Sequence, residues 1–432
     1  MKKTLALAAM VLLVVLAVTN VYANGQKEKG KVSLRVMDWQ SGGKDFWDKT
    51  DADFMALHPE ITIVHEPVPY GQYFDKVGAY IAAKDGPDLM QLETGMGTLK
   101  YKDALVPLNK YLGAYVKDIN GLDAFCEDFD ATKNIYGVPH TNQGHMIYYN
   151  IKVFKEAGLD PAHPPKTWRE MDAAVKAIRA VGKQPFAFGG KEWAVLWTFC
   201  SLPDQVITLE QKRGILAKTT KWTEAPLKNS ISLLKYMIDN KWLSDGSAES
   251  SVTPEAQDMF TSGKAAFMNS IISDAFNWKL WGDTIGYDNF GVMKFPAIEK
   301  DYPLKGVSPV QPGASLMDLH GGIAFTLPKW SKNPDQAVLY IKYVTSPEVQ
   351  TRYLLEGGAI PSNKKIDLSV VKAAQFKTIM KWVNEPGVTP PGLLYMSPRE
   401  WDALIRQTQL MITGQANVDQ FARAMQEAQD QR

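Results

Sequence analysis

Cysteine is almost absent from this sequence, with only Cys126 and Cys200 in 432 residues. The protein can therefore contain at most one disulfide within the chain. In an oxidising compartment the two cysteines could form that disulfide, or both could be buried as free thiols. The sequence leaves this choice open, because it does not tell whether their Cα atoms approach to bonding distance. We assign neither cysteine a function.

Sequence motifs for metal, nucleotide and hydrolase chemistry are also missing. The patterns H-E-x-x-H, C-x-x-C and G-x-S-x-G do not occur. In "GMGTLK", Lys100 occupies the position where a dinucleotide fingerprint needs its third glycine. In "SGKAAF", the upstream glycine and the Ser/Thr of a phosphate loop are absent. We therefore expect no bound metal and no cofactor.

No stretch of the mature chain is long and uncharged enough to span a membrane, which takes roughly 20 apolar residues. The apolar run at 5–18 is shorter, follows two lysines, and precedes "VYA", whose small residues suit a cleavage site after Ala23. This pattern predicts a secretory signal peptide at 1–23. No cysteine lies near the cleavage point, so a lipid anchor has no attachment residue. We expect a soluble mature chain, free in the periplasm.

Neither sign of charge is in excess. The full chain has 48 basic and 47 acidic residues, and removal of Lys2 and Lys3 with the signal changes the net charge from +1 to −1. A nearly neutral protein has no electrostatic field that would attract nucleic acid or anionic membrane. We therefore exclude nucleic acid as a partner.

The length and the hydrophobic pattern favour two α/β lobes. A single core usually divides above about 250 to 300 residues. Residues 31–39 alternate as a strand, 44–59 suit a helix closed by proline, and 60–69 suit a second strand, which is the unit of a parallel sheet. A third strand would end just before Glu93, at the sheet edge where α/β proteins bind ligands. No internal repeat or coiled coil appears, which argues against a purely structural role.

Several helix starts can be read from capping residues. Thr167 followed three residues later by Glu170 is a capping box. Further starts pair a capping side chain with proline at the first helical position, at Thr253-Pro254, Asn333-Pro334 and Ser346-Pro347.

Two kinds of residue are candidates for function. His140 and His145 lie in "YGVPHTNQGHMIYYN", five positions apart, which places them on opposite faces of a strand and argues against a shared metal. An ordinary hydrogen-bonded role is favoured for both. Trp39 and Trp193 lie beside polar residues at expected strand-to-helix turns. Such rings can stack on the C–H face of a sugar, although most tryptophans fill the core.

The ordered set of segments resembles family 1 of the extracellular solute-binding proteins, the sugar receptors of ABC importers. The matching segments cover nearly the whole mature chain in the family's order: "HPEITIVHEPV", "GPDLMQLETG", "LVPLNKY", "YGVPHTNQGHMIYYNIKVFKEAGLDPAHPPKTWREM", "FTSGKAAFMNS", "HGGIAFTLPKWSKNPDQAVLYIKYVTSPEVQ" and "GGAIPSNK". No single segment is diagnostic, but the order is specific.

The resemblance implies a two-lobed periplasmic binding protein fold of the α/β class. Each lobe would be a mostly parallel sheet flanked by helices, and a hinge of several strands would join the lobes. Chain crossings are expected near 138–141, 290–292 and 360–362. The first lobe would then comprise 24–138 and 291–360, and the second 139–290 and 361–432.

The resemblance also implies a set of ligand-binding residues in the cleft. "WDALIRQTQLMITG" is similar to the last-helix pattern in which a tryptophan thirteen residues before a glycine stacks on sugar, here Trp401 before Gly414. The full implied set is Trp39, Gln40, Glu93, His140, Asn142, Glu192, Trp193, Asn269, Asp274, Gly321, Gly322 and Trp401. Gly321 and Gly322 would form a turn that lets a backbone approach the solute. After "GKAAFM" the chain reads "NSIISDAFN" and lacks the aromatic usual there, which favours a smaller or differently hydroxylated ligand.

The implied function is that of a monomeric receptor without catalytic residues. It would bind a carbohydrate and pass it to ABC permease subunits. Two alternatives stay open. A secreted glycan-degrading enzyme would need two carboxylates about 5 to 10 Å apart across one bond. The same fold could also bind a polyamine or ferric iron, although the pair Tyr148-Tyr149 suits a strand better than an iron site.

Overall fold

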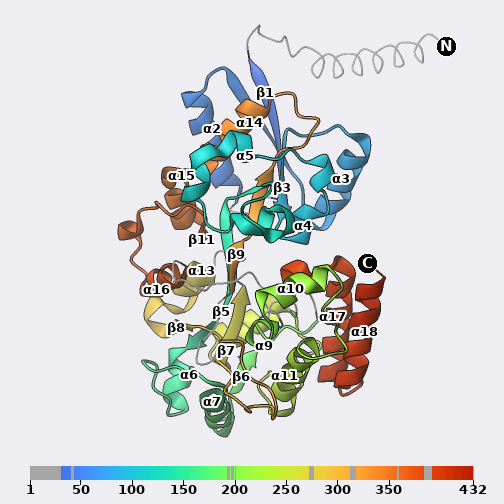
Figure 1. Cartoon of the computed structure of the whole chain (residues 1–432). Helices are drawn as coiled ribbons and strands as arrows, with labels where there is room; N and C mark the ends of the chain where they lie inside the picture. Colours follow the sequence, from blue (N-terminus) through green and yellow to red (C-terminus); the bar gives the residue numbers. More distant parts are fainter. Residues whose placement is uncertain are drawn as a thin grey trace, which may run out of the picture.

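The computed structural model describes residues 31–39, 43–191, 195, 199, 201–271, 277–311, 318–357, 360–383 and 392–431. Within these residues the chain forms two α/β lobes, each built on its own sheet (Figure 1). The two-lobed α/β fold predicted from the sequence is confirmed.

The sheet of the first lobe has the strand order β2-β1-β3-β10-β4. The first three strands are parallel, and β10 runs antiparallel to both of its neighbours. Tyr73, on a flanking helix, donates its hydroxyl to backbone oxygens of Met37 and Gln91 and so ties that helix to the sheet. The strands are β1 (Val32–Asp38), β2 (Ile61–Pro67), β3 (Leu89–Glu93), β4 (Val138–Pro139) and β10 (Ile323–Thr326).

Helices from both ends of the sequence complete the first lobe. The helix predicted after β1 is α2 (Lys44–Leu57), which buries Phe46, Trp47 and Phe54. Helix α14 packs against α2 although nearly 300 positions separate them. The others are α3 (Tyr70–Ala83), α4 (Met96–Leu99), α5 (Asn109–Leu112), α14 (Pro334–Val344) and α15 (Pro347–Arg352), with short 3-10 turns that include η3 (Leu122–Phe125) and η4 (Glu127–Phe129).

The sheet of the second lobe is organised around β5, whose ten residues are all buried. Among the strands that the structure describes in this sheet, only β6 and β7 pair in parallel, and β5 runs antiparallel to β7, β8, β9 and β11. This arrangement differs from the mostly parallel sheet expected for this lobe, because β5 enters from the first lobe while β9 leads back to it. The strands are β5 (Thr141–Asn150), β6 (Gln184–Ala187), β7 (Ala265–Ile271), β8 (Phe290–Met293), β9 (Asp318–Gly321) and β11 (Ile360–Pro361).

The helices of the second lobe cover this sheet and extend to the carboxyl terminus (Figure 1). The predicted capping box at Thr167 and Glu170 begins α7, and Ser346 caps α15 as expected. The start predicted at Thr253-Pro254 is instead a short irregular turn, and regular helix begins at Gln257. The helices are α6 (Ile151–Glu156), α7 (Trp168–Ala180), α9 (Pro203–Val206), α10 (Leu209–Leu216), α11 (Leu227–Asp239), α12 (Gln257–Thr261), α13 (Asn277–Ile285), α16 (Ala374–Val383), α17 (Pro398–Ile412) and α18 (Val418–Asp430).

Over the described residues, the chain crosses between the sheets three times. It passes from β4 to β5 at His140, from β9 to β10 at Gly322, and reaches β11 after α15. The first and third crossings fall where they were predicted. The second does not, because residues 290–293 form β8, which pairs with β5 in the second sheet. The crossing lies about thirty residues later.

Cys126 is a free thiol buried in the first lobe, and its Sγ donates to the carbonyl oxygen of Leu122 at 3.0 Å. Burial raises the pKa of this thiol to about 12, so it stays protonated and unreactive. Cys200 lies outside the described residues.

Candidate ligand-binding site between the lobes

The hinge is built around the start of β5. Asn142 pairs with Ile360 on one side and with Gly321 on the other, and its Nδ2 donates to the carbonyl oxygen of Pro361 at 2.8 Å. The side chain of Asn142 is fully buried. Asn142, proposed from the resemblance as a ligand contact, thus joins two crossing strands to each other.

His140 is also fully buried in the hinge. Its backbone nitrogen donates to the oxygen of Ile323, and its own carbonyl accepts from Nε2 of Gln350, each at 2.9 Å. Its ring lies among Trp47 and Phe325, with centroids 5.7 and 5.2 Å away. Burial lowers the pKa of His140 to about 3, so the imidazole is neutral. The His140 Nε2 lies 3.2 Å from Nε2 of Gln91, a hydrogen bond that agrees with the ordinary hydrogen-bonded role favoured from the sequence.

Gly321 and Gly322 are buried in the same junction. A Cβ on Gly321 would lie 2.4 Å from the carbonyl oxygen of Gly121, and a Cβ on Gly322 would lie 2.2 Å from Cγ of Gln143. The two glycines therefore let protein segments approach one another at the crossing. The approach to the solute that the resemblance implies for them stays a prediction, and the segments that approach them in the structure are those of Gly121 and Gln143.

An aromatic and acidic group lies at the carboxyl ends of β1 and β3, the ends that point toward the second lobe (Figure 1). Trp39 follows β1, Glu93 ends β3, and Tyr70 begins α3. The Tyr70 hydroxyl donates to Oε1 of Glu93 at 2.6 Å. The Trp39 ring meets the rings of Tyr70 and Tyr73 edge to face, at 5.9 and 4.9 Å. We call Trp39, Tyr70 and Glu93 the lobe 1 cluster.

The electrostatics of the lobe 1 cluster are set by burial. Desolvation raises the pKa of Glu93, against the opposing effects of the Tyr70 hydrogen bond and the charge of Lys100. The Tyr70 side chain keeps 56% of its surface exposed and is available to a ligand. Tyr70 was missed in the sequence, although its place directly after β2 and Pro69 puts it at the same sheet edge as Trp39 and Glu93.

Trp401 lies in the first turn of α17 in the second lobe, partly buried against the hydrophobic cluster that also contacts Trp39. Its helix begins with a capping box of Ser397 and Glu400, and the buried Glu400 accepts from the indole nitrogen of Trp222 at 3.1 Å. Trp401 is therefore held on a firmly anchored turn.

The other candidates from the sequence are described incompletely. Asn269 lies in β7 with its backbone paired to Ile147, and nothing is described of its side chain. Four candidates lie outside the described residues: Gln40, Glu192, Trp193 and Asp274. Trp39 and Trp401 thus remain the aromatic candidates with a described position, one on each lobe.

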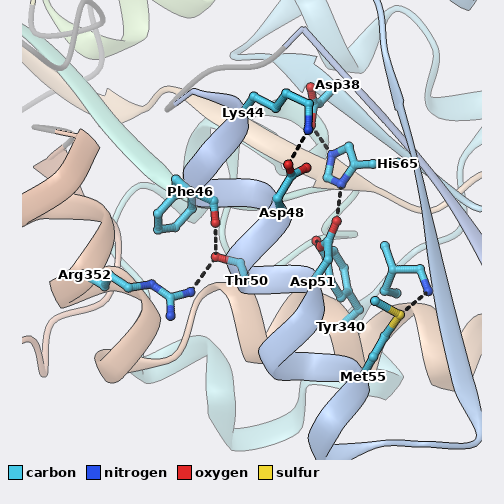
Figure 2. A network of polar contacts seen from close by, with 11 residues as sticks. Asp38, Lys44, Phe46, Asp48, Thr50, Asp51, Met55, His65, Tyr340 and Arg352 are labelled. Carbon is cyan, nitrogen blue, oxygen red and sulfur yellow. Dashed lines mark hydrogen bonds and ion pairs between the residues drawn. The ribbon is translucent and has the colours of Figure 1, made fainter.

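A polar network at the carboxyl end of β1 was not found from the sequence (Figure 2). His65 on β2 lies between Asp38, at the end of β1, and Asp51 on α2, with 2.7 Å from its Nδ1 to Asp51 Oδ2. The Tyr340 hydroxyl donates to the other oxygen of Asp51 at 2.5 Å. Burial alone would lower the pKa of His65, but hydrogen bonds and charge attraction to the two carboxylates outweigh it and raise the pKa to about 9. A protonated His65 thus joins β1, β2 and α2 next to Trp39.

The described residues show no group of three or more His, Cys, Asp or Glu side chains that could hold a metal ion. Over the same residues, no helix has the length and apolar character needed to cross a membrane.

Comparison with known proteins decides the family. The sequence profile of the family described as "Bacterial extracellular solute-binding protein" matches residues 38–351. The chain belongs to this family. A solved structure titled "Chitin oligosaccharide binding protein" superposes on the solute-binding protein with a TM-score of 0.77, at 25% identity over 93% of this chain and 98% of that one.

Curated relatives agree with this assignment. The sn-glycerol-3-phosphate-binding periplasmic protein UgpB of Yersinia pseudotuberculosis is 26% identical over 336 residues, 71% of this chain and 69% of the relative. A protein of Brucella abortus (strain 2308) named "Putative binding protein BAB2_0491" is 23% identical over 417 residues, 88% of this chain and 92% of the relative. The protein is thus a solute-binding protein of the kind that serves ABC transporters, and these relatives are binding proteins.

Proposed function

We propose that this solute-binding protein captures an uncharged carbohydrate between its lobes and delivers it to the permease subunits of an ABC importer. The observation that carries the proposal is the lobe 1 cluster. Trp39 and Tyr70 offer aromatic surface for the C–H face of a sugar ring, and Glu93 offers hydrogen-bonding oxygens to its hydroxyls. The chitin oligosaccharide binding protein with the same fold supports this class of ligand.

The second candidate solute is sn-glycerol 3-phosphate. It is favoured by the name of the Yersinia relative and by Lys100, whose positive charge acts on Glu93. An argument against this solute is that its negatively charged phosphate would lie close to the carboxyl group of Glu93, and two negative charges repel each other. We therefore place the neutral sugar first.

Closure of the lobes would couple binding to transport. A solute that contacts both lobes binds the closed form more tightly, and this difference in affinity shifts the population toward closure. The three crossings at His140, Gly322 and β11 would form the hinge. The solute-free protein should then be mainly open, and small-angle scattering should show compaction when solute is added. Unchanged scattering at saturating solute would argue against closure.

The remaining features of the proposal come from the sequence. A signal peptide at 1–23 would send the protein to the periplasm, where it would act as a monomer without catalytic activity. We also propose that the first segment of the first lobe ends, and the first segment of the second lobe begins, near residue 139. Purified protein incubated with oligosaccharides should give no new products on chromatography, and product formation would favour the alternative of a glycan-degrading enzyme.

The solute can be identified by a thermal-shift screen. The panel holds mono-, di- and oligosaccharides, polyols, sn-glycerol 3-phosphate, polyamines and ferric citrate. A ligand present at 100 times its Kd adds about 2.7 kcal/mol to stability, enough for a visible rise in Tm. A sugar should give this rise. A rise with polyamine or iron alone would keep the fold and overturn the solute class.

Variants locate the binding site. Trp401→Ala and Trp193→Ala should abolish the sugar-dependent rise in Tm, because each removes a stacking surface. Trp330→Ala is the matched control, because Trp330 is a partly buried tryptophan away from the lobe 1 cluster. Its indole nitrogen donates to the backbone oxygen of Pro87, which lies at the opposite end of β3 from Glu93. Loss of the rise in the control as well would point to a general loss of folding rather than to the cleft.

A further inference from the structure

The lobes touch at a second place besides the hinge, on the side where Figure 1 shows α4 above α10. In the first lobe, Gly95 precedes α4 and Phe129 ends η4. In the second lobe, Leu394 and Tyr395 end the 3-10 turn η9 (Gly392–Tyr395). The ring centroids of Phe129 and Tyr395 are 4.3 Å apart, and a Cβ on Gly95 would lie 2.9 Å from the carbonyl oxygen of Leu394. We call these four residues the latch.

The latch is buried and closely packed. Phe129, Leu394 and Tyr395 expose 4%, 1% and 0% of their surface and belong to one hydrophobic cluster that continues into both lobes. Gly95 has φ +59°, where a side chain would be strained, and any side chain there would meet the Leu394 backbone. We use the term closed for the arrangement in which these contacts between the lobes are made. Opening the lobes at this place would break the ring contact and return apolar surface to water, so the latch favours the closed form.

The second lobe holds its half of the latch firmly. The backbone nitrogen of Gly392 donates to Oδ1 of Asp204 at 3.2 Å, and Nζ of Lys212 lies 2.7 Å from the same oxygen. Both side chains of this ion pair are almost completely buried. Arg213, next to Lys212, donates from Nη2 to the carbonyl oxygen of Phe129 at 3.4 Å, which adds a hydrogen bond between the lobes.

We propose that the latch sets how much of the protein is closed before any solute arrives. Part of the free energy of closure then comes from contacts between the lobes, and the solute supplies the rest. This inference rests on the proposed function, because closure is the step that it regulates. The apparent solute affinity should follow the closed fraction of the free protein, since only that fraction is ready to hold the solute from both sides.

The test measures the closed fraction without any solute. Dyes attached through azide-bearing amino acids at exposed Ala79 in α3 and Lys176 in α7 report the distance between the lobes by single-molecule energy transfer. Tyr395→Leu or Phe129→Leu should lower the ratio of closed to open molecules by roughly two- to tenfold, the effect of one aromatic pair. The double variant should do little more than either single change, because both remove the same contact.

Two further variants make the result specific. Tyr148→Leu is the matched control, since Tyr148 is buried in the second lobe against Trp281, with centroids 4.2 Å apart, and takes no part in the latch. It should leave the closed fraction unchanged. Arg213→Gln removes the hydrogen bond to Phe129 from a solvent-exposed side chain, so it should lower the closed fraction without affecting the core. This variant still tests the proposal if Tyr395→Leu does not fold.

The proposal is overturned if the closed fraction is the same in the wild type and the latch variants, or if Tyr148→Leu lowers it equally. Because the measurement contains no solute, its outcome is separate from that of the thermal-shift screen. A screen in which nothing binds would refute the proposed function and leave the effect of the latch measurable.

Discussion

The network around His65 predicts an unusual loss of stability at alkaline pH. The imidazole is held between Asp38 and Asp51 (Figure 2). Its side chain is 15% exposed. Its pKa is about 9 in the folded protein, compared with an ordinary value of 6.5. The folded state therefore binds the His65 proton more tightly than the unfolded chain does, and protonation stabilises the fold.

The magnitude follows from proton linkage. A shift from 6.5 to about 9 corresponds to about 3 kcal/mol, at 1.36 kcal/mol for each pH unit. Because the folded pKa is raised, this stabilisation is fully present below pH 6.5. It decreases as pH rises above 6.5 and is lost once the pH passes the folded value of about 9. The free energy of unfolding should thus fall by about 3 kcal/mol between pH 6 and pH 10 on account of this one group.

The assay is denaturant unfolding at a series of pH values, followed by tryptophan fluorescence, for the wild type and His65→Gln. At pH 6 the variant should be less stable by about 3 kcal/mol or more, because it leaves two buried carboxylates without their cation. The difference between the two proteins should shrink toward pH 10, where wild-type His65 is neutral too.

The matched control is His163→Gln. His163 also pairs with an aspartate, Asp160, but its side chain is 79% exposed, so its removal should change stability little at any pH. If the gap between the wild type and His65→Gln were the same at pH 6 and pH 10, His65 would not carry the linked proton and our reading of the network would be wrong.

Two further predictions concern the hinge and the scaffold of the latch. Gly321→Ala should destabilise the protein by about 1 to 3 kcal/mol in denaturant unfolding, because the added Cβ would lie 2.4 Å from a backbone oxygen. The control is Gly78→Ala, at an exposed helical position where a Cβ would have nothing within 4 Å. This change should be neutral or stabilising. Lys212→Met should cost about 3 kcal/mol, because it removes the buried cation that pairs with the buried Asp204 carboxylate. Lys279→Met removes an exposed pair and should cost less than about 1 kcal/mol in the same assay. Equal effects within either pair would contradict the packing described for it.

The sequence predicted well those features that depend on neighbouring residues. The capping box at Thr167 and Glu170 uses groups three positions apart, and the strand–helix–strand unit at 31–69 follows from periodicity within each element. The two-lobed fold and the family followed from the order of many short segments. Trp39 and Glu93 could be placed at a sheet edge because each ends or follows a strand that the hydrophobic pattern reveals.

The pairing of strands could not be predicted from neighbouring residues in the same way. The apolar residues of β8 indicate a strand, but not the sheet to which it belongs, and so the second crossing was predicted near 290 rather than at Gly322. The same reason explains why the second sheet was expected to be mostly parallel. Which strand pairs with which depends on contacts between residues far apart in the chain.

The sequence by itself therefore determined many of the elements, the two lobes and the family. Only the tertiary structure decided that Asp38, Asp51, His65 and Tyr340 share one network and that Phe129 meets Tyr395 across the lobes. The physical reason is that hydrogen bonds, desolvation and ring contacts act over a few ångströms in space. Residues separated by up to about 300 positions come within that range only after the sheets and the hinge have formed.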